Sequence, residues 1–247
     1  MKLNTSKHIL KCLRRHIKEA NNIVAILGVE MLVESGGVNF DTNDETYRIE
    51  QEYGFTPEEI LSGSFFCAKQ KMFYDFYRKE VLRTSIHSTP GYEALLILQK
   101  RNKLKTVINK NYYDVPKEIK FDNLISLSGT VSHNFCPRCK KSFSSEYLIS
   151  KEGIPYCDSC KASLRPDIRL FGERINNALF TQAVNACTQA DLILMLGKDT
   201  YHDNLLPNRT ESRKQTRILF TSEKYMENPD FDFIIHDEIQ EIIPLII

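Results

Sequence analysis

The stretch NLISLSGTVSHNFCPRC, residues 123–139, begins as a short apolar run and ends in a pair of cysteines. Similar apolar runs, each followed by a polar or glycine turn, cover residues 22–28, 105–109, 191–197, 217–222 and 232–236. Runs this short and continuous are typical of strands buried on both faces of a parallel sheet. Helical patterns separate most of them, so the sequence predicts an α/β fold with a doubly wound, Rossmann-like parallel sheet.

The pair Cys136 and Cys139 that ends this stretch is matched by a second pair, Cys157 and Cys160, in the spacing C-x2-C-x17-C-x2-C. Two such knuckles can place four thiolates tetrahedrally around Zn²⁺, and four sulfur ligands leave the metal no open position. The alternative, four thiols buried as small hydrophobic side chains, fits less well because both pairs contain polar, turn-forming residues. The sequence therefore predicts a structural zinc site that stabilises a small lobe.

Composition limits the possible partners and locations. The 247 residues can bury a sizeable core, and 33 Lys and Arg against 32 Asp and Glu give a formal net charge of +1. This balance indicates neither a nucleic acid nor a membrane partner. There is no apolar run of roughly 20 residues and no signal-peptide core near the start, so we expect a cytoplasmic protein. The isolated Cys12, Cys67 and Cys187 are expected to be buried thiols and not parts of a disulfide framework.

Two segments interrupt the alternation of strands and helices, and both are expected to belong to an inserted small lobe. The first, residues 41–82, contains the sequence TPEE at Thr56–Glu59, with an N-cap Thr, a Pro at the first helical position and a Glu at N3. It is predicted to be a helical module. The second, residues 131–164, is the predicted zinc-binding lobe, a four-cysteine zinc ribbon. Residues 1–40, 83–130 and 165–247 would form the large domain.

This order of parts resembles the sirtuins, the NAD-dependent protein deacylase and ADP-ribosyltransferase family, from about residue 23 to residue 247. LGVEMLVESGGVNF (27–40) is similar to the family's G-A-G-I-S and E-S-G-I-P-D-F-R motifs. VINKNYYDV (107–115) and LISLSG (124–129) are similar to T-Q-N-I-D and L-H-G-S, and LRPDIRLFGE (164–173) to R-P-x-V-V-x-F-G-E. The helical module is most similar to that of bacterial members.

The resemblance assigns Gly28, Glu30, Asn111 and Gly197 to the family's NAD-binding positions. It places Ser128 where the family has its catalytic histidine, the general base that helps the acyl-imidate intermediate to collapse. A serine hydroxyl does not take a proton near neutral pH as imidazole does, so no catalytic residue is expected at this position.

The other histidines offer no clear substitute for this base. His133 follows Ser128 by five residues and is expected to lie too far away. His87 and His202 are expected to be surface residues.

The expected phosphate site also departs from the family. Glu30 stands where the family has its second glycine, and a carboxylate beside a pyrophosphate would cost about 1 to 4 kcal/mol of binding free energy. Asn39 and Asp41 stand in place of the Asp and Arg of D-F-R. Lys198 and Asp199 replace phosphate-facing hydroxyl groups of the family's G-T-S motif.

Three further departures concern the two ends of the expected dinucleotide. Lys110 replaces a Gln, and Tyr113 replaces the Asp that helps to fix nicotinamide in the family. A tyrosine is large enough to fill that pocket. Phe220 lies near the position of the Asn that would hold the adenine ribose.

These departures lead to an interpretation with two alternatives. The leading interpretation is a zinc-containing sirtuin-like pseudoenzyme, in which NAD-dependent catalysis is lost or much weakened and which acts as a binding or regulatory module. The first alternative is an active NAD-dependent protein ADP-ribosyltransferase or deacylase with an atypical pocket, which requires Glu30 to point away from the phosphates. The second is a sensor of a cationic or less charged nucleotide that suits Glu30, Asp41 and Asp199.

A protein or peptide partner is expected at the loop Phe171-Gly172-Glu173. In the family that the chain resembles, an extended peptide adds as a strand beside this loop. The alternative is that the motif only packs the zinc-binding lobe onto the sheet.

Overall fold

The six predicted strands form one parallel sheet in the computed structural model, which describes residues 5–197, 205–208, 215–223 and 228–247. The sheet has the order β3-β2-β1-β7-β8-β9, and the chain reverses its direction across the sheet between β1 and β7. The predicted α/β fold is therefore confirmed. The strands are β1 (Ile23–Leu27), β2 (Leu104–Asn109), β3 (Leu124–Ser126), β7 (Leu192–Leu196), β8 (Thr216–Phe220) and β9 (Phe233–Ile235).

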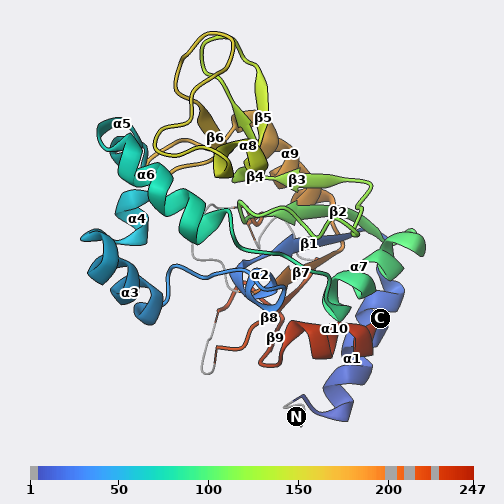
Figure 1. The fold of residues 1–247 in the computed structure, drawn as a ribbon. Coiled ribbons are helices and arrows are strands. Elements are labelled where there is room, and N and C mark those ends of the chain that lie inside the picture. Colours follow the sequence, from blue (N-terminus) through green and yellow to red (C-terminus); the bar gives the residue numbers. More distant parts are fainter. Residues whose placement is uncertain (1–4, 198–204, 209–214, 224–227) are drawn as a thin grey trace.

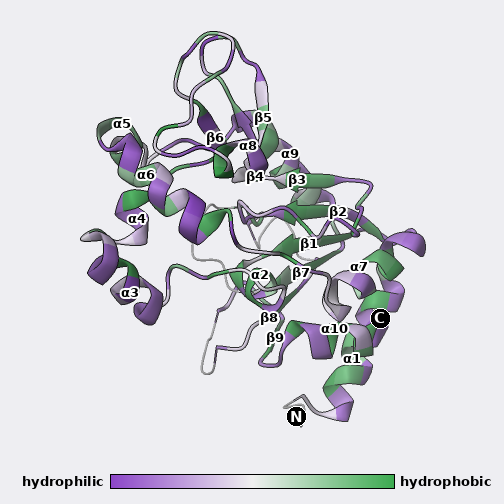
Figure 2. Cartoon of the chain, viewed as in Figure 1, coloured by the Kyte–Doolittle hydropathy of each residue, from purple (hydrophilic) through white to green (hydrophobic). Residues whose placement is uncertain are grey.

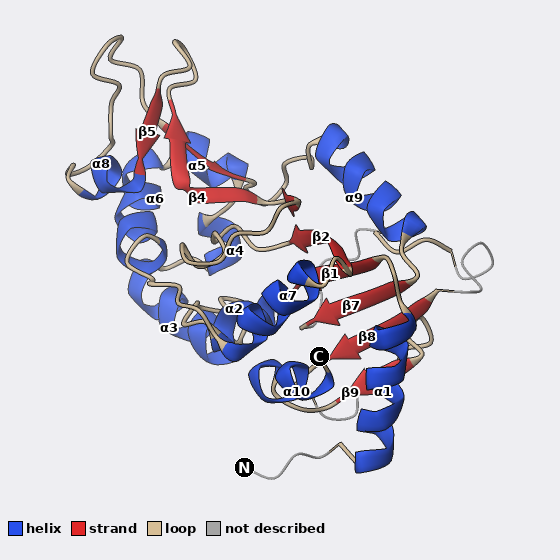
Figure 3. Cartoon of the chain, turned by 90° about the vertical axis from the view of Figure 1, so that its right-hand side faces the viewer, coloured by secondary structure: helices blue, strands red, loops and turns tan. Residues whose placement is uncertain are grey.

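Helices cover both faces of this sheet (Figure 3). Successive side chains of β1 point to opposite faces: Ala25 packs in the core beneath α7 (Pro90–Lys100) and α10 (Ile239–Ile246), and Ile26 packs under α9 (Asn177–Gln189). The first helix, α1 (Lys7–Glu19), lies beside α10. All five residues of β1 are buried, and Figure 2 shows the hydrophobic colouring of this central strand.

The helical module contains α3 (Asn43–Tyr53), α4 (Pro57–Ile60), α5 (Gly63–Ala68), α6 (Gln70–Phe76) and the single π-helical turn η1 (Tyr77–Val81). At the start of α4 the Glu59 N–H donates to Thr56 Oγ1 at 3.2 Å, and the Thr56 N–H donates to Glu59 Oε2 at 2.8 Å. This is the capping box that the sequence predicts.

A second, antiparallel sheet carries the cysteine pairs and projects from the large sheet at the top of Figure 1. Its strands β4 (Gly129–Phe135), β5 (Ser142–Ser144) and β6 (Arg165–Ile168) accompany the short helix α8 (Ser145–Ile149). Its residues share one hydrophobic cluster with the helical module, and the Tyr74 hydroxyl donates to the Leu164 carbonyl at 2.6 Å. The domain boundaries suggested by the sequence remain a proposal.

The isolated cysteines differ in burial. Cys187 is buried in α9, and desolvation raises the pKa of its thiol to about 12. Cys12 is half-buried, but Cys67 is exposed, so the prediction of a buried thiol is wrong for Cys67. The short helix α5 already directs Phe65 and Phe66 into the core, which leaves the next side chain facing outward. Among the described residues, no helix has the length and apolar character needed to cross a membrane.

The helix α2 (Val29–Glu34) ends in a carboxylate that caps α10. Glu34 accepts hydrogen bonds from the N–H groups of Ile239 at 2.7 Å and Gln240 at 2.9 Å, yet burial raises the pKa of Glu34 to about 7. The folded state therefore retains a proton that the unfolded chain loses, and the contribution of Glu34 to stability falls as the pH rises from about 4.5 to about 7.

We expect Glu34→Gln to remove this contribution. Urea unfolding at pH 5 and at pH 7.5 should show a smaller loss of stability between the two pH values in the variant than in the wild type. The difference should be of the order of 1 kcal/mol, because solvent screens a half-buried carboxylate. An identical pH dependence in both proteins would contradict the role assigned to Glu34.

Candidate functional site

A cavity of about 220 Å³ lies where the carboxyl ends of β1 and β2 meet the helical module and the second sheet. In open α/β sheets, ligands bind beyond the carboxyl ends of the strands, near the point where the strand order reverses. Among the described residues, most of the wall is apolar. The polar and charged side chains that line it are Asn39, Asp41, Glu58, Lys110, Asn111, Tyr112, Ser128, Arg169 and Glu173.

Ser128 lines this cavity at the turn that leads into β4. It is only 7% exposed, and its hydroxyl donates to the Lys110 carbonyl at 2.7 Å. This hydrogen bond fixes the hydroxyl but does not make it a base. The site therefore has a hydrogen-bonding hydroxyl group at the position where the sirtuins have their catalytic histidine.

His133 does not line the cavity. It lies on β4, with Nδ1 2.8 Å from Asp167 Oδ2 and Nε2 3.1 Å from Ser142 Oγ. Both ring nitrogens are thus engaged within the second sheet. His87 is exposed and also lies outside the residues that line the cavity.

The turn after β1 is tied to both neighbouring strands. The Gly28 N–H donates to the Leu196 carbonyl at 2.8 Å, and Asn111 Nδ2 donates to the Gly28 carbonyl at 3.1 Å. The Asn111 N–H in turn donates to Asn109 Oδ1 at 3.0 Å. Gly28 and Asn111 both line the cavity, so the structure brings these two candidate positions together.

Glu30 is not among the residues that line the cavity, and its carboxylate is directed toward β8. Thr221 Oγ1 donates to Glu30 Oε1 at 2.6 Å, and the Ser222 N–H donates to Glu30 Oε2 at 2.6 Å. Gly197 approaches Glu30 from the end of β7: its φ is +100°, and a Cβ there would lie 2.8 Å from the Glu30 nitrogen. Glu30 therefore reaches from the end of β1 past β7 to the end of β8.

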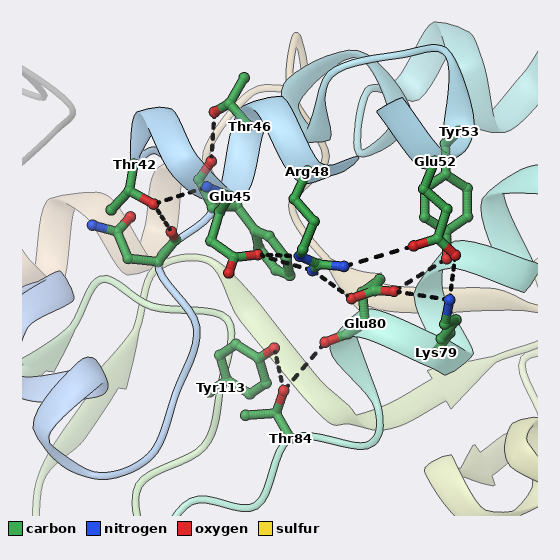
Figure 4. Close-up of polar contacts among 12 residues, drawn as sticks. Thr42, Glu45, Thr46, Arg48, Glu52, Tyr53, Lys79, Glu80, Thr84 and Tyr113 are labelled. Atoms are coloured by element: carbon green, nitrogen blue, oxygen red, sulfur yellow. Dashed lines mark hydrogen bonds and ion pairs between the residues drawn. The ribbon is translucent and has the colours of Figure 1, made fainter. Parts of the chain in front are cut away.

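Tyr113 is turned away from the cavity, contrary to the idea that it fills the pocket. It is 2% exposed, and its hydroxyl lies 3.3 Å from both the Val81 carbonyl and Thr84 Oγ1. Thr84 donates onward to the Glu80 carbonyl at 3.2 Å (Figure 4). Burial raises the pKa of Tyr113 to about 12, so its hydroxyl stays neutral and anchors the module.

The Glu80 carboxylate extends this anchor into α3 (Figure 4). It accepts from Arg48 Nη2 at 2.7 Å and from the Tyr53 hydroxyl at 3.2 Å. The wall of the cavity formed by the helical module is thereby fixed to the loop that follows β2.

The end of β8 contains residues that sequence reasoning missed. Phe220 is completely buried in the core, so it faces no ligand. The next two residues, Thr221 and Ser222, hold the Glu30 carboxylate. The available signal was the pair of hydroxyl residues that directly follows an apolar run. Lys198, Asp199, Thr200 and His202 lie outside the described residues.

The loop Phe171-Gly172-Glu173 lines the cavity and also joins it to the helical module. The Phe171 N–H donates to the Leu61 carbonyl at 2.9 Å, and the Gly63 N–H donates to the Phe171 carbonyl at 3.0 Å. Glu173 pairs with Arg165 at 2.7 Å. The loop thus has a packing role, and it also borders the cavity.

The four cysteines of the two pairs come together as the spacing predicts, with their sulfur atoms within 4.8 Å of one another. The Sγ atoms of Cys136 and Cys160 are 3.3 Å apart, and those of Cys139 and Cys157 are 3.6 Å apart. The Cys139 N–H donates to the Cys136 sulfur and helps to lower the pKa of that thiol to about 6. Four convergent thiols fit Zn²⁺, and they leave no ligand position for catalysis.

Comparison with known proteins yields matches over most of the chain. A family model described as "Sir2 family" matches residues 28–201. A protein of Clostridium tetani named NAD-dependent protein deacetylase is 31% identical over 188 residues, which are 76% of each chain. A Clostridium perfringens protein of the same name is 25% identical over 237 residues, covering 95% of this chain and 97% of its own.

Solved structures extend the likeness to the fold. A structure described as a Sir2 homolog–NAD complex has a TM-score of 0.80 and 22% identity, covering 99% of this chain and 93% of the other. A structure described as Sir2 bound to acetylated peptide also has a TM-score of 0.80, with 20% identity and 95% of each chain covered.

Proposed function

This chain belongs to the Sir2 family as a sirtuin of bacterial type, and on that premise we propose that it is an active NAD-dependent protein ADP-ribosyltransferase or deacylase. An active enzyme with an atypical pocket thus replaces the interpretation of the chain as a pseudoenzyme. The Clostridium tetani relative, named an NAD-dependent protein deacetylase, supports the use of NAD. The solved complex of a Sir2 homolog with NAD supports it as well.

The observation that carries the proposal is the orientation of Glu30. The strongest argument for lost binding was a carboxylate beside the pyrophosphate. Thr221 and Ser222 hold that carboxylate at the end of β8, away from the cavity. Tyr113 likewise leaves the cavity open. The positions of Glu30 and Tyr113 therefore remove two of the sequence-based arguments against NAD binding.

When bound, NAD would supply the glycosidic bond to nicotinamide, whose cleavage frees an ADP-ribosyl group for transfer. Asn111 and Gly28 form the polar edge of the cavity where that end of the cofactor would lie. Leu32, Phe40 and Leu61 form an apolar wall that would exclude water. We assign cofactor binding to Gly28 and Asn111, whereas the family positions Glu30 and Gly197 are not among the residues that line the cavity.

The same cavity supports a protein substrate. It opens beside the loop Phe171-Gly172-Glu173, and solved Sir2 structures described as bound to acetylated or propionylated peptides support a peptide there. The zinc bound by Cys136, Cys139, Cys157 and Cys160 would hold this part of the cavity in shape without taking part in the chemistry.

A serine at position 128 favours ADP-ribosyl transfer over deacylation. Its hydroxyl donates to the Lys110 carbonyl and cannot hold a proton as a general base near neutral pH. Deacylation remains the second candidate, because the curated relatives are named deacetylases.

The test is release of nicotinamide from NAD by the zinc-loaded protein, measured with and without acetylated peptides and with a mixture of acceptor proteins. Nicotinamide release with labelling of an acceptor would support transfer. Release that depends on an acylated peptide would support deacylation. The absence of binding and of release at millimolar NAD would refute the proposal.

A histidine restored at position 128 should change the balance of the two reactions. We expect Ser128→His to increase deacylation by about 10²-fold, the usual contribution of a positioned acid or base. Nicotinamide release should change much less. Ser128→Ala is the control, since it removes the hydroxyl without adding a base. An equal effect of both variants on deacylation would contradict the assignment of this position.

A further inference from the structure

A hydrogen-bonded row of three polar side chains crosses the strands of the second sheet. The row runs from Ser142 on β5 through His133 on β4 to Asp167 on β6. His133 Nε2 lies 3.1 Å from Ser142 Oγ, and His133 Nδ1 lies 2.8 Å from Asp167 Oδ2. A hydroxyl, an imidazole and a carboxylate joined in this order are the groups that activate a serine for nucleophilic attack.

The carboxylate sets which nitrogen of the histidine carries the proton. A carboxylate only accepts hydrogen bonds, so Nδ1 of a neutral His133 carries the proton and donates to Asp167. Nε2 then has the lone pair that accepts from the Ser142 hydroxyl. The hydroxyl of Ser142 therefore faces a base, whereas that of Ser128 faces the Lys110 carbonyl.

The row is open to solvent. The side chains of His133 and Asp167 are 42% and 47% exposed, and Ser142 is exposed as well. Their strands belong to the lobe that projects from the large sheet (Figure 1). None of the three residues lines the cavity of the candidate functional site. An exposed serine outside that cavity suits an acceptor, which the active site of another molecule can reach.

We propose that Ser142 is an acceptor of the ADP-ribosyl group and that a second copy of this chain transfers the group to it. This inference rests on the proposed function, which supplies the transfer activity. The cavity has Ser128 where the sirtuins have their general base, so it is suited to an acceptor that carries its own base. Ser142 carries one, because His133 accepts from its hydroxyl.

The transfer step balances without a further reactant. Ser142 Oγ forms a bond to the anomeric carbon of the nicotinamide ribose, while the glycosidic bond from that carbon to nicotinamide breaks. Nicotinamide leaves with the bonding electron pair, which cancels the positive charge of its ring. The Ser142 proton passes to His133 Nε2 and then to solvent. Asp167 is a positioning residue that also stabilises the transient imidazolium.

The first experiment locates the modification. Zinc-loaded protein is incubated with NAD, and tandem mass spectrometry identifies the modified residues. We expect ADP-ribose on Ser142, absent from that peptide in Ser142→Ala and formed about 10²-fold more slowly in His133→Gln, the usual contribution of a positioned base. Ser144→Ala is the matched control: Ser144 is an exposed serine on the same strand, and the described hydrogen bonds of His133 do not include it.

A mixed sample tests transfer between copies. Isotope-labelled Asn111→Ala, which loses the side-chain amide assigned to cofactor binding, serves as the acceptor for unlabelled wild-type enzyme. ADP-ribose on Ser142 of the labelled chain would support the inference. Modification of the wild-type chain alone would overturn it.

A third measurement does not depend on NAD. A fluorophosphonate forms a bond to an activated serine with loss of fluoride, and we expect it to label Ser142 at least tenfold faster than Ser144. Asp167→Asn should bring the two rates closer together, because it removes the charge that orients His133. A general loss of stability would not favour one serine over the other. Equal labelling of both serines in the wild type would overturn the inference.

The outcomes distinguish this inference from the proposed function. Transfer of ADP-ribose to other proteins without modification of Ser142 would overturn the inference and leave the proposed function intact. The absence of NAD binding and of nicotinamide release would overturn both.

Discussion

Cys136→Ser is expected to abolish stoichiometric zinc binding and to unfold the second sheet. The variant leaves three thiols for a metal that takes four, and binding to a structural zinc site contributes about 10 to 16 kcal/mol to folding in small domains. Three thiols bind the metal more weakly than four, so much of this free energy of folding is lost. We therefore expect a loss of at least about 4 kcal/mol, which lowers Tm by about 10 °C or more in a chain of this size.

The damage should extend beyond the metal site. Cys136 and Cys157 belong to the same hydrophobic cluster as Phe73, Tyr74 and Tyr77 of the helical module, which forms part of the cavity wall. Nicotinamide release should thus fall together with zinc content, although no cysteine of this cluster lines the cavity.

Zinc content by atomic spectroscopy, together with thermal unfolding, tests this prediction. Cys67→Ser provides the matched control because Cys67 is exposed and lies outside the four-cysteine cluster. It should keep one zinc ion and the wild-type Tm. A Cys136→Ser protein with full zinc content and unchanged Tm would show that the cluster does not hold the metal.

Gly129→Ala should destabilise the protein by about 3 kcal/mol or more. Gly129 has a φ of +74°, and a Cβ on it would overlap with the carbonyl oxygen of Asp167 on the paired strand β6. Backbone atoms cannot yield as a flexible side chain can, so β4 and β6 would have to separate. Because Gly129 follows Ser128, the change would also displace the Ser128 hydroxyl from the Lys110 carbonyl.

Gly153→Ala is the comparison for this prediction. Gly153 also has a positive φ, of +63°, but no atom lies within 4 Å of a Cβ placed there. It should cost only about 1 kcal/mol, the strain of a left-handed conformation without a clash. Urea unfolding of both variants would measure the difference. Similar losses in the two proteins would mean that the close approach of β4 and β6 is not tight.

The features that the sequence predicted correctly are those with a local signal. Short continuous apolar runs identified all six strands of the large sheet, because burial on both faces requires such runs. The cysteine spacing identified the four-cysteine cluster, since each knuckle is a short turn. The capping box at Thr56 and Glu59 was predictable because its two residues are only three positions apart.

The features that the sequence did not predict depend on contacts between distant segments. Glu30 and Thr221 are 191 residues apart, so no local pattern shows that the carboxylate turns toward β8. Tyr113 was expected to fill a pocket, yet its hydroxyl donates a hydrogen bond to Thr84, which lies 29 residues earlier in the chain. In both cases the sequence singled out the residue but did not predict the direction of its side chain.

The shared core of the helical module and the second sheet has a consequence for synthesis on the ribosome. The carbonyl that accepts from the Tyr74 hydroxyl belongs to Leu164, 90 residues later in the chain. The aromatic residues Phe73, Tyr74 and Tyr77 therefore cannot complete their packing until both cysteine pairs have been translated. During that interval the nascent chain exposes these rings, so zinc supply during translation should govern the yield of folded protein as well as its final stability.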